Sequence, residues 1–190
     1  MVHGLTPARK AEPSAAPIPT PPIPAPSIAP FLIGHGYDLH RIQQATANKK
    51  LILAGIVASE ELGAISHSDG DVIFHALVDA MLGALGQGDI GQLFPNTDPR
   101  WKDAPSRLFV EEAMRRVRQA GYRVGNVDIT LLLEKPKIGP LRQQMLVSLR
   151  SLLGGAAIVN LKAGTNEGCD AIGRGEAVAA HAVVLLAAAT

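Results

Sequence analysis

One stretch of the chain, DVIFHALVDAMLGAL from Asp71 to Leu85, limits the fold more than any other. Its apolar residues fall close to helical spacing, and they occupy most faces of the helix that this spacing predicts. A helix that is apolar on nearly every face is stable only when it is buried. The rest of the chain must therefore provide elements that cover this helix on several sides.

The segments around this helix alternate between strand and helix patterns. We expect strands in FLIGH, in the two halves of KLILAGIVA around Gly55, and in VGNVDITLLL, AIVNLKA and EAVAAHAVVLL. We expect further helices in SRLFVEEAMRRVRQAG and LRQQMLVSLRSLLGG, each ending in glycine. Ser68 or Asp69 is expected to cap the buried helix by accepting its free N–H groups. This alternation indicates an α/β or an α+β layer with one sheet and helices on a face. Of the two we expect an α+β fold with one mixed sheet and helices on one face.

The first thirty residues have a different composition, because they hold nine of the fourteen prolines. Each proline fixes φ and removes a backbone donor, so regular helices and sheets are disfavoured there. We predict that residues 1–30 are a proline-rich disordered tail or linker and that residues 31–190 form one domain. The segment has no long apolar run of the kind found in a secretory signal. A bacterial, cytoplasmic location is favoured over plastid import.

Charge and cysteine content exclude several classes of partner. The formal net charge is +1, which gives no reason to expect nucleic acid or an anionic membrane as a partner. The single cysteine, Cys169, rules out an internal disulfide and is consistent with a reducing compartment. The apolar C-terminal run AVAAHAVVLLAAA is shorter than a membrane span and is predicted to be core.

Histidines and aspartates gather around the motif GHGYDLHRI, residues 34–42. Residues i and i+2 of a strand point to the same side, so Asp38 and His40 are expected to face one point. His75 lies within the buried helix, and Asp71 or Asp79, one turn away, is expected to accept its second ring N–H. One carboxylate and two imidazoles form a suitable catalytic zinc site. A core histidine with no metal role is the alternative.

The long motif HSDGDVIFHALVDAMLGALGQGDIGQLFPNTDP, residues 67–99, extends this picture. Together with GHGYDLH before it and GRGE after it, the chain resembles the 2-C-methyl-D-erythritol 2,4-cyclodiphosphate synthase family of the non-mevalonate isoprenoid pathway. The resemblance runs from about Ile33 to Leu186. It implies an α+β sandwich related to ferredoxin-like folds, and a homotrimer with active sites between adjacent subunits.

The resemblance also implies the site residues. Zinc is expected on Asp38, His40 and His75, and magnesium or manganese on Glu167. His67 and Thr165 are expected to act on the reacting phosphates as catalytic residues. These residues would share substrate binding with Leu39, Ser68, Asp89, Ile90, Gly91, Phe94, Pro95, Asn96, Thr97, Asp98, Leu133, Glu134, Lys135, Pro136, Lys137, Ile138, Gly139, Gly164, Asn166, Ala171 and Arg174. Asn96, Gly164, Asn166 and Ala171 depart from the residues that are usual in the family.

The reaction implied by the resemblance is the conversion of 4-diphosphocytidyl-2-C-methyl-D-erythritol 2-phosphate to 2-C-methyl-D-erythritol 2,4-cyclodiphosphate and CMP. The 2-phosphate of the substrate would attack its own β-phosphate. Two other functions remain open. A zinc-dependent phosphoesterase would use water as the nucleophile and release inorganic phosphate. A non-catalytic module of a bifunctional enzyme would be fused to, or associated with, a cytidylyltransferase.

Overall fold

The computed structural model describes residues 29–47 and 49–189. The predicted tail, residues 1–30, lies outside the described residues except for Ala29 and Pro30. In chain order the elements are β1 (Phe31–Gln44), β2 (Leu51–Leu53), β3 (Ile56–Ser59), β4 (Leu62–Ile65), α1 (Val72–Ala84), α2 (Ile90–Leu93), η1 (Pro99–Trp101), α3 (Arg107–Gln119), β5 (Tyr122–Leu132), η2 (Gly139–Leu141), α4 (Arg142–Leu152), β6 (Ile158–Gly164), α5 (Asp170–Gly173) and β7 (Ala177–Ala188).

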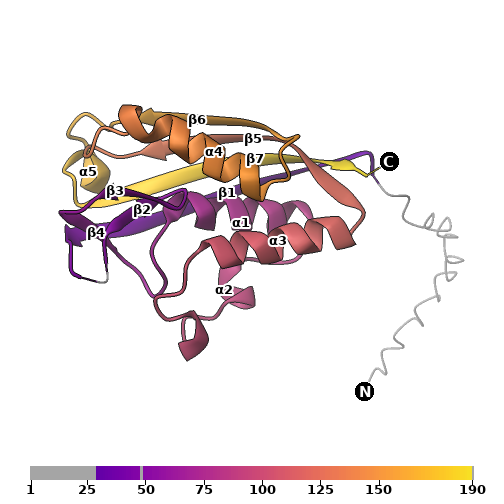
Figure 1. Cartoon of the computed structure of the whole chain (residues 1–190), viewed down its shortest axis with the longest axis horizontal. Coiled ribbons are helices and arrows are strands. Elements are labelled where there is room, and N and C mark those ends of the chain that lie inside the picture. The colour runs from indigo at the N-terminus through magenta and orange to yellow at the C-terminus, as the bar shows by residue number, and fades with distance from the viewer. Residues whose placement is uncertain (1–28, 48, 190) are drawn as a thin grey trace, which may run out of the picture.

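The predicted α+β fold with a mixed sheet is confirmed (Figure 1). Five strands pair in the order β4-β1-β7-β5-β6, and β2 pairs with β3 in a separate ribbon. Among the described strands only β5 and β6 run parallel; the other pairs are antiparallel. No helix in the described ranges is both long and apolar enough to cross a membrane.

One face of the five-stranded sheet carries the core. Val127, Ile129 and Leu131 of β5 lie on this face, as the alternation in VGNVDITLLL predicts, and all three are buried. They pack in one apolar cluster with α1, α3 and α4. The opposite face of β1 and β7 leaves large apolar side chains exposed, including Phe31, Ile33, Tyr37 and Val183. The three long helices α1, α3 and α4 therefore lie on one face, whereas the short helix α5 packs against Ala177 and Ala179, which alternate with the core-facing residues of β7.

The buried helix α1 packs directly against β1 because two glycines permit a close approach. A Cβ atom added at Gly34 would lie 1.8 Å from the carbonyl oxygen of Ala80. A Cβ atom added at Gly36 would lie 1.9 Å from the carbonyl oxygen of Ala76. Any side chain at either position would therefore push α1 off the strand. The glycines of GHGYDLHRI thus bring the helix that carries His75 next to the strand that carries Asp38 and His40.

Two local expectations were wrong. The strand predicted in FLIGH continues to Gln44, because β1 pairs with β7 as far as Arg41 and with β4 from Arg41 onward. The cap of α1 is Asp71, whose side chain accepts from the N–H groups of Ile73 and Phe74, rather than Ser68 or Asp69. Asp71 is the residue with extended backbone immediately before the helix, which is where a side-chain oxygen reaches those groups.

Candidate metal and phosphate site

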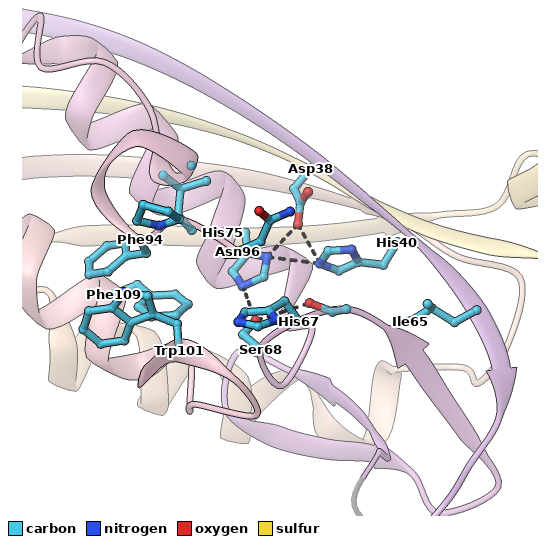
Figure 2. A pocket seen from close by; sticks show the side chains of 14 residues that line it. Asp38, His40, Ile65, His67, Ser68, His75, Phe94, Asn96, Trp101 and Phe109 are labelled. Atoms are coloured by element: carbon cyan, nitrogen blue, oxygen red, sulfur yellow. Dashed lines mark hydrogen bonds and ion pairs between the residues drawn. The ribbon is translucent and has the colours of Figure 1, made fainter. Parts of the chain in front are cut away.

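Three ligand atoms from β1 and α1 converge on one point (Figure 2). Asp38 Oδ2 lies 3.1 Å from His40 Nε2 and 2.9 Å from His75 Nδ1. The two ring nitrogens are 3.1 Å apart. The strand alternation places Asp38 and His40 on the side of the sheet that faces α1, as expected. These three residues form a group that can hold a metal ion.

The electrostatics of this group favour an ionised carboxylate. Burial opposes the ionisation of Asp38, but hydrogen bonds and positive charge from His40 and His75 outweigh it. The pKa of Asp38 therefore lies well below its usual range. The site thus offers one negative charge and two imidazoles, which suits a divalent cation.

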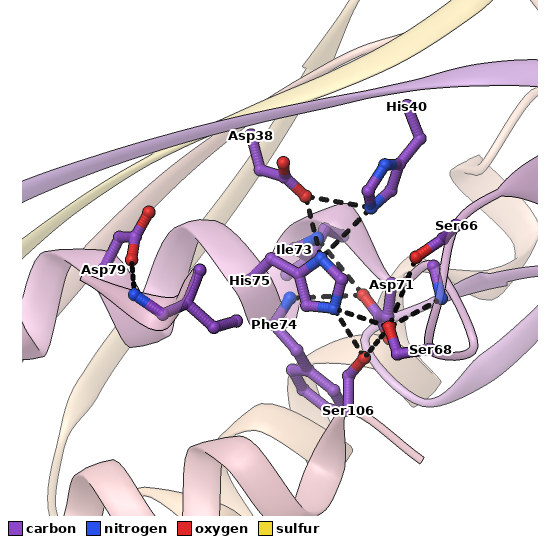
Figure 3. Close-up of polar contacts among 12 residues, drawn as sticks. Asp38, His40, Ser66, Ser68, Asp71, Ile73, Phe74, His75, Asp79 and Ser106 are labelled. Atoms are coloured by element: carbon purple, nitrogen blue, oxygen red, sulfur yellow. Dashed lines mark hydrogen bonds and ion pairs between the residues drawn. The ribbon is translucent and has the colours of Figure 1, made fainter. Parts of the chain in front are cut away.

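The second ring nitrogen of His75 does not contact either carboxylate expected from the sequence. His75 Nε2 lies 2.7 Å from Ser106 Oγ and 3.1 Å from Ser68 Oγ (Figure 3). Asp71 instead accepts four backbone N–H groups, two in α1 and two at Ala54 and Gly55 between β2 and β3. Asp79 accepts from the N–H of Ile90 at 2.7 Å. His75 Nε2 therefore contacts two serines, and one of them, Ser106, lies after the motif of residues 67–99.

A cavity of about 420 Å³ opens beside the three ligands. Ten of the expected site residues line it: Asp38, His40, His67, Ser68, His75, Ile90, Gly91, Phe94, Pro95 and Asn96. Four lining residues were not predicted, namely Ile65, Ser66, Trp101 and Phe109. Trp101 Nε1 is buried and has no hydrogen-bond partner among the described residues. The stacked rings of Phe94 and Phe109 give the cavity one aromatic wall.

Other expected residues near this cavity have structural contacts. Asp89 caps α2, and Asp98 caps η1 and pairs with Arg100. The backbone carbonyl of Asp98 lies 3.3 Å from His67 Nε2. Leu39 is 40% exposed and alternates with Asp38 and His40, so it belongs to the opposite face of the sheet.

Six of the remaining expected residues line a second cavity. A smaller cavity of about 200 Å³ is lined by Leu133, Pro136, Lys137, Ile138, Ala163, Gly164 and Thr165. It shares no lining residue with the first cavity. Glu134 supports its rim by accepting from the N–H of Asn166 at 2.9 Å. Within one chain, the group that contains Thr165 is therefore separate from the triad.

Glu167 and its neighbours lie on the connection from β6 to β7. Glu167 has a positive φ of 52°, and Asn166 hydrogen-bonds the carboxylate of Asp170. Arg174 pairs with Glu176 at 3.0 Å, and Ala171 packs against Ile172, Ala177 and Ala179. Side chains of this connection therefore contact one another and the start of β7.

A lysine that the sequence patterns did not indicate holds the His67 loop. Lys49 Nζ donates to the carbonyl of Ser66 at 3.1 Å and to that of Ser68, and pairs with Asp103 at 2.7 Å. The N–H of Asp103 donates to the carbonyl of His67 at 2.8 Å. Three consecutive carbonyls of the loop are therefore fixed, which limits where the imidazole of His67 can lie.

Comparison with known proteins agrees with the resemblance seen in the motifs. A rice (Oryza sativa subsp. japonica) protein named 2-C-methyl-D-erythritol 2,4-cyclodiphosphate synthase, chloroplastic, is 48% identical over 176 residues, which cover 92% of this chain and 76% of that protein. The structure of a Plasmodium falciparum IspF–CDP complex matches with a TM-score of 0.74 and 34% identity, covering 86% of this chain and all of that one.

The structure of the bifunctional IspDF from Campylobacter jejuni matches with a TM-score of 0.76 and 36% identity. The match covers 83% of this chain but only 42% of that protein. The sequence model of the YgbB family matches residues 31–187, nearly the whole of the described region. On this match, and on the identity to the rice protein, the chain belongs to the YgbB family.

Proposed function

We propose that the chain converts 4-diphosphocytidyl-2-C-methyl-D-erythritol 2-phosphate to 2-C-methyl-D-erythritol 2,4-cyclodiphosphate and CMP. The observation that carries the proposal is the convergence of Asp38, His40 and His75 at a cavity, in a chain 48% identical to a protein named for this product. His40 on β1 and His75 on α1 are 35 residues apart in the sequence, so the fold is what brings the three side chains together.

The donor set fits zinc. Tetrahedral zinc with bonds near 2.0–2.1 Å holds its ligand atoms about 3.3–3.4 Å apart. The three ligand atoms here are 2.9–3.1 Å apart, so a small outward movement would admit the ion. When bound, zinc would supply positive charge and polarise a phosphate oxygen. We propose Glu167 as the ligand of magnesium or manganese, since a carboxylate suits a hard cation.

The side chains of the first cavity are suited to holding the reacting end of the substrate. His67, Ser68 and Asn96 offer polar groups, while Phe94, Trp101 and Phe109 offer an apolar wall that excludes water. An oxygen of the 2-phosphate then attacks the β-phosphorus, and the bond from that phosphorus to the CMP oxygen breaks. No water is consumed. Reactions of this kind need mainly positioning and neutralisation of charge, so no covalent nucleophile is required.

The second cavity is our candidate for the cytidine end. We propose that Leu133–Gly139 and Gly164–Glu167 of one subunit complete the site of a neighbouring subunit in a homotrimer. Two features support this: the cavities are separate within one chain, and β1 and β7 leave an apolar face uncovered. Thr165, which lines the second cavity, would then stabilise the transferring phosphate. A ferredoxin-related sandwich and the 31–190 domain boundary remain predictions.

Two further expectations belong to this proposal. The Campylobacter jejuni structure is named as bifunctional, which supports a fused or associated cytidylyltransferase as a partner, with residues 1–30 as the linker. A bacterial cytoplasmic location remains our prediction, although the rice relative is named chloroplastic. Fusing residues 1–30 to a fluorescent protein in plant cells tests it, and plastid import of the fusion would contradict it.

Phosphorus NMR of the reaction tests the function. We expect signals of CMP and a cyclic diphosphate to appear together in equal amounts. Inorganic phosphate as the product would favour the phosphoesterase, and no turnover by zinc-loaded trimer would favour the non-catalytic module. The control is His75→Ala, which should lose both zinc and turnover because it removes a ligand from the buried side of the site.

A further inference from the structure

A buried chain of polar contacts leads away from the proposed metal ligand His75. Its Nε2 atom lies 2.7 Å from Ser106 Oγ, and Ser106 is fully buried (Figure 3). Ser106 Oγ in turn contacts Asp69 Oδ1, and the N–H of Ser106 donates to Asp69 Oδ2 at 2.9 Å. The chain therefore runs from imidazole to hydroxyl to carboxylate.

The directions of these hydrogen bonds follow from the groups involved. An ionised carboxylate only accepts, and a serine hydroxyl has one hydrogen to give. The hydroxyl hydrogen of Ser106 is therefore committed to Asp69. The oxygen of Ser106 can offer only a lone pair to His75, so the ring must donate from Nε2. With the Nε2 hydrogen directed at Ser106, Nδ1, the atom that faces Asp38 and His40, is the ring nitrogen left to bind a cation.

We propose that Ser106 and Asp69 are a positioning pair that fixes the tautomer and orientation of His75 for a divalent cation bound through Nδ1. The inference rests on the metal role proposed above. Partners of this kind also make the imidazole a more basic ligand. Ser68 Oγ, at 3.1 Å from the same nitrogen, is a weaker second acceptor.

The fold places this pair at the junction of two helices. Ser106 immediately precedes α3, and Asp69 lies just before the cap of α1. A backbone hydrogen bond from Asp69 N to the carbonyl of Ala104 joins the same two segments at 3.1 Å. The start of α3 is thus tied to the start of the helix that carries the ligand, and a shift of α3 would turn the ring.

Ser106→Ala tests the pair through zinc affinity, measured by competition with a coloured chelator. We expect zinc binding to weaken by roughly 10–100-fold, the usual effect of losing the outer partner of a ligating histidine. The matched control is Ser151→Ala on α4, whose hydroxyl donates to the carbonyl of Ser148 at 2.7 Å. Its zinc affinity should equal that of the wild type. Unchanged affinity in folded Ser106→Ala would overturn the proposal.

A second readout follows the ring in the zinc-loaded protein. Nitrogen-15 NMR of histidine-labelled, zinc-loaded protein reports which ring nitrogen binds the metal and which carries the hydrogen. We expect wild-type His75 to bind through Nδ1 and to carry its hydrogen on Nε2, and Ser106→Ala to lose this single arrangement. Binding through Nε2 in the wild type would overturn the proposal. If the wild type binds no zinc, the zinc role itself fails; if the wild type and Ser106→Ala bind zinc equally well, only the positioning pair fails.

Asp69→Asn provides a further test should Ser106→Ala fail to fold. It keeps the size of the side chain and removes the charge that holds the hydroxyl hydrogen. We again expect weaker zinc binding than in the wild type and a mixed tautomer of His75. Wild-type values for both would refute the pair.

Discussion

The close packing of α1 on β1 predicts a large effect from adding one methyl group at Gly36. In Gly36→Ala the new Cβ would lie 1.9 Å from the carbonyl oxygen of Ala76 and 2.7 Å from the amide nitrogen of Ala80. Real Cβ atoms essentially never approach within 3.0 Å of such atoms. The backbone of α1 must therefore move by roughly 1 Å, because neither neighbour is a flexible side chain.

That movement occurs where the metal ligands meet. Asp38 and His40 stay on β1, whereas His75 moves with α1, so the 2.9 Å contact between Asp38 and His75 should open to about 4 Å. Ligands of one tetrahedral zinc lie about 3.3–3.4 Å apart, so the widened site should bind zinc poorly. Overpacking of this kind also lowers the unfolding free energy by about 1–3 kcal/mol.

Urea unfolding and zinc content of the purified variant measure both effects. The matched control is Gly83→Ala on α1, where the nearest atom to a new Cβ is His35 O at 3.9 Å. This control should keep its zinc and gain about 0.5–1 kcal/mol from the better helix propensity of alanine. Full zinc occupancy and wild-type stability in Gly36→Ala would refute the packing explanation.

Four further predictions follow from the structure. Lys49→Met should free the His67 loop and reduce kcat by about 10–100-fold, while Lys50→Met, which loses only its surface pair with Glu60, should be silent; equal kcat values in steady-state assays would contradict this. Burial raises the pKa of Asp71 to about 7 from 3.8, so the folded state holds a proton that the unfolded chain has released. The unfolding free energy should therefore fall as the pH rises from about 4 to about 7, and urea titrations should show a smaller fall in Asp71→Asn if this residue is the cause. Glu167→Gln should retain zinc and need more added magnesium for turnover, since an amide is a poorer ligand than a carboxylate; a wild-type magnesium titration would reject the ligand role. Removing residues 1–28 should leave turnover and sedimentation unchanged, because the carbonyls of Ala29 and Pro30 that accept hydrogen bonds are kept; a smaller assembly would show that the tail is structural.

The metal ligands were predictable because their placement depends on local geometry. Asp38 and His40 need only the alternation of a strand, and His75 needs only a buried helix. The motif of residues 67–99 then showed the family resemblance, which implies that these three residues bind one metal ion. The alternation of Asp38 and His40 already assumes a strand beyond FLIGH, but the end of that strand at Gln44 was not predictable, because it depends on the pairing of Arg41–Gln44 with β4.

The supporting residues were missed for the same reason. Ser106 lies 31 residues from His75, and Lys49 lies 17 and 19 residues from the carbonyls that it holds. No spacing rule connects such pairs, since only the tertiary fold brings them together. Asp71 was mistaken for a histidine partner because a carboxylate one turn away is a reasonable partner in a helix, whereas the structure uses it as a cap.

The central claim is that the substrate's own phosphate, and not water, attacks at the triad cavity. Running the reaction in water labelled with a heavy oxygen isotope, followed by mass spectrometry of the products, tests this directly. The proposed reaction consumes no water, so both CMP and the cyclic diphosphate should carry no label after one turnover. Incorporation of one labelled oxygen into either product, or into released phosphate, would contradict the account and identify a hydrolase.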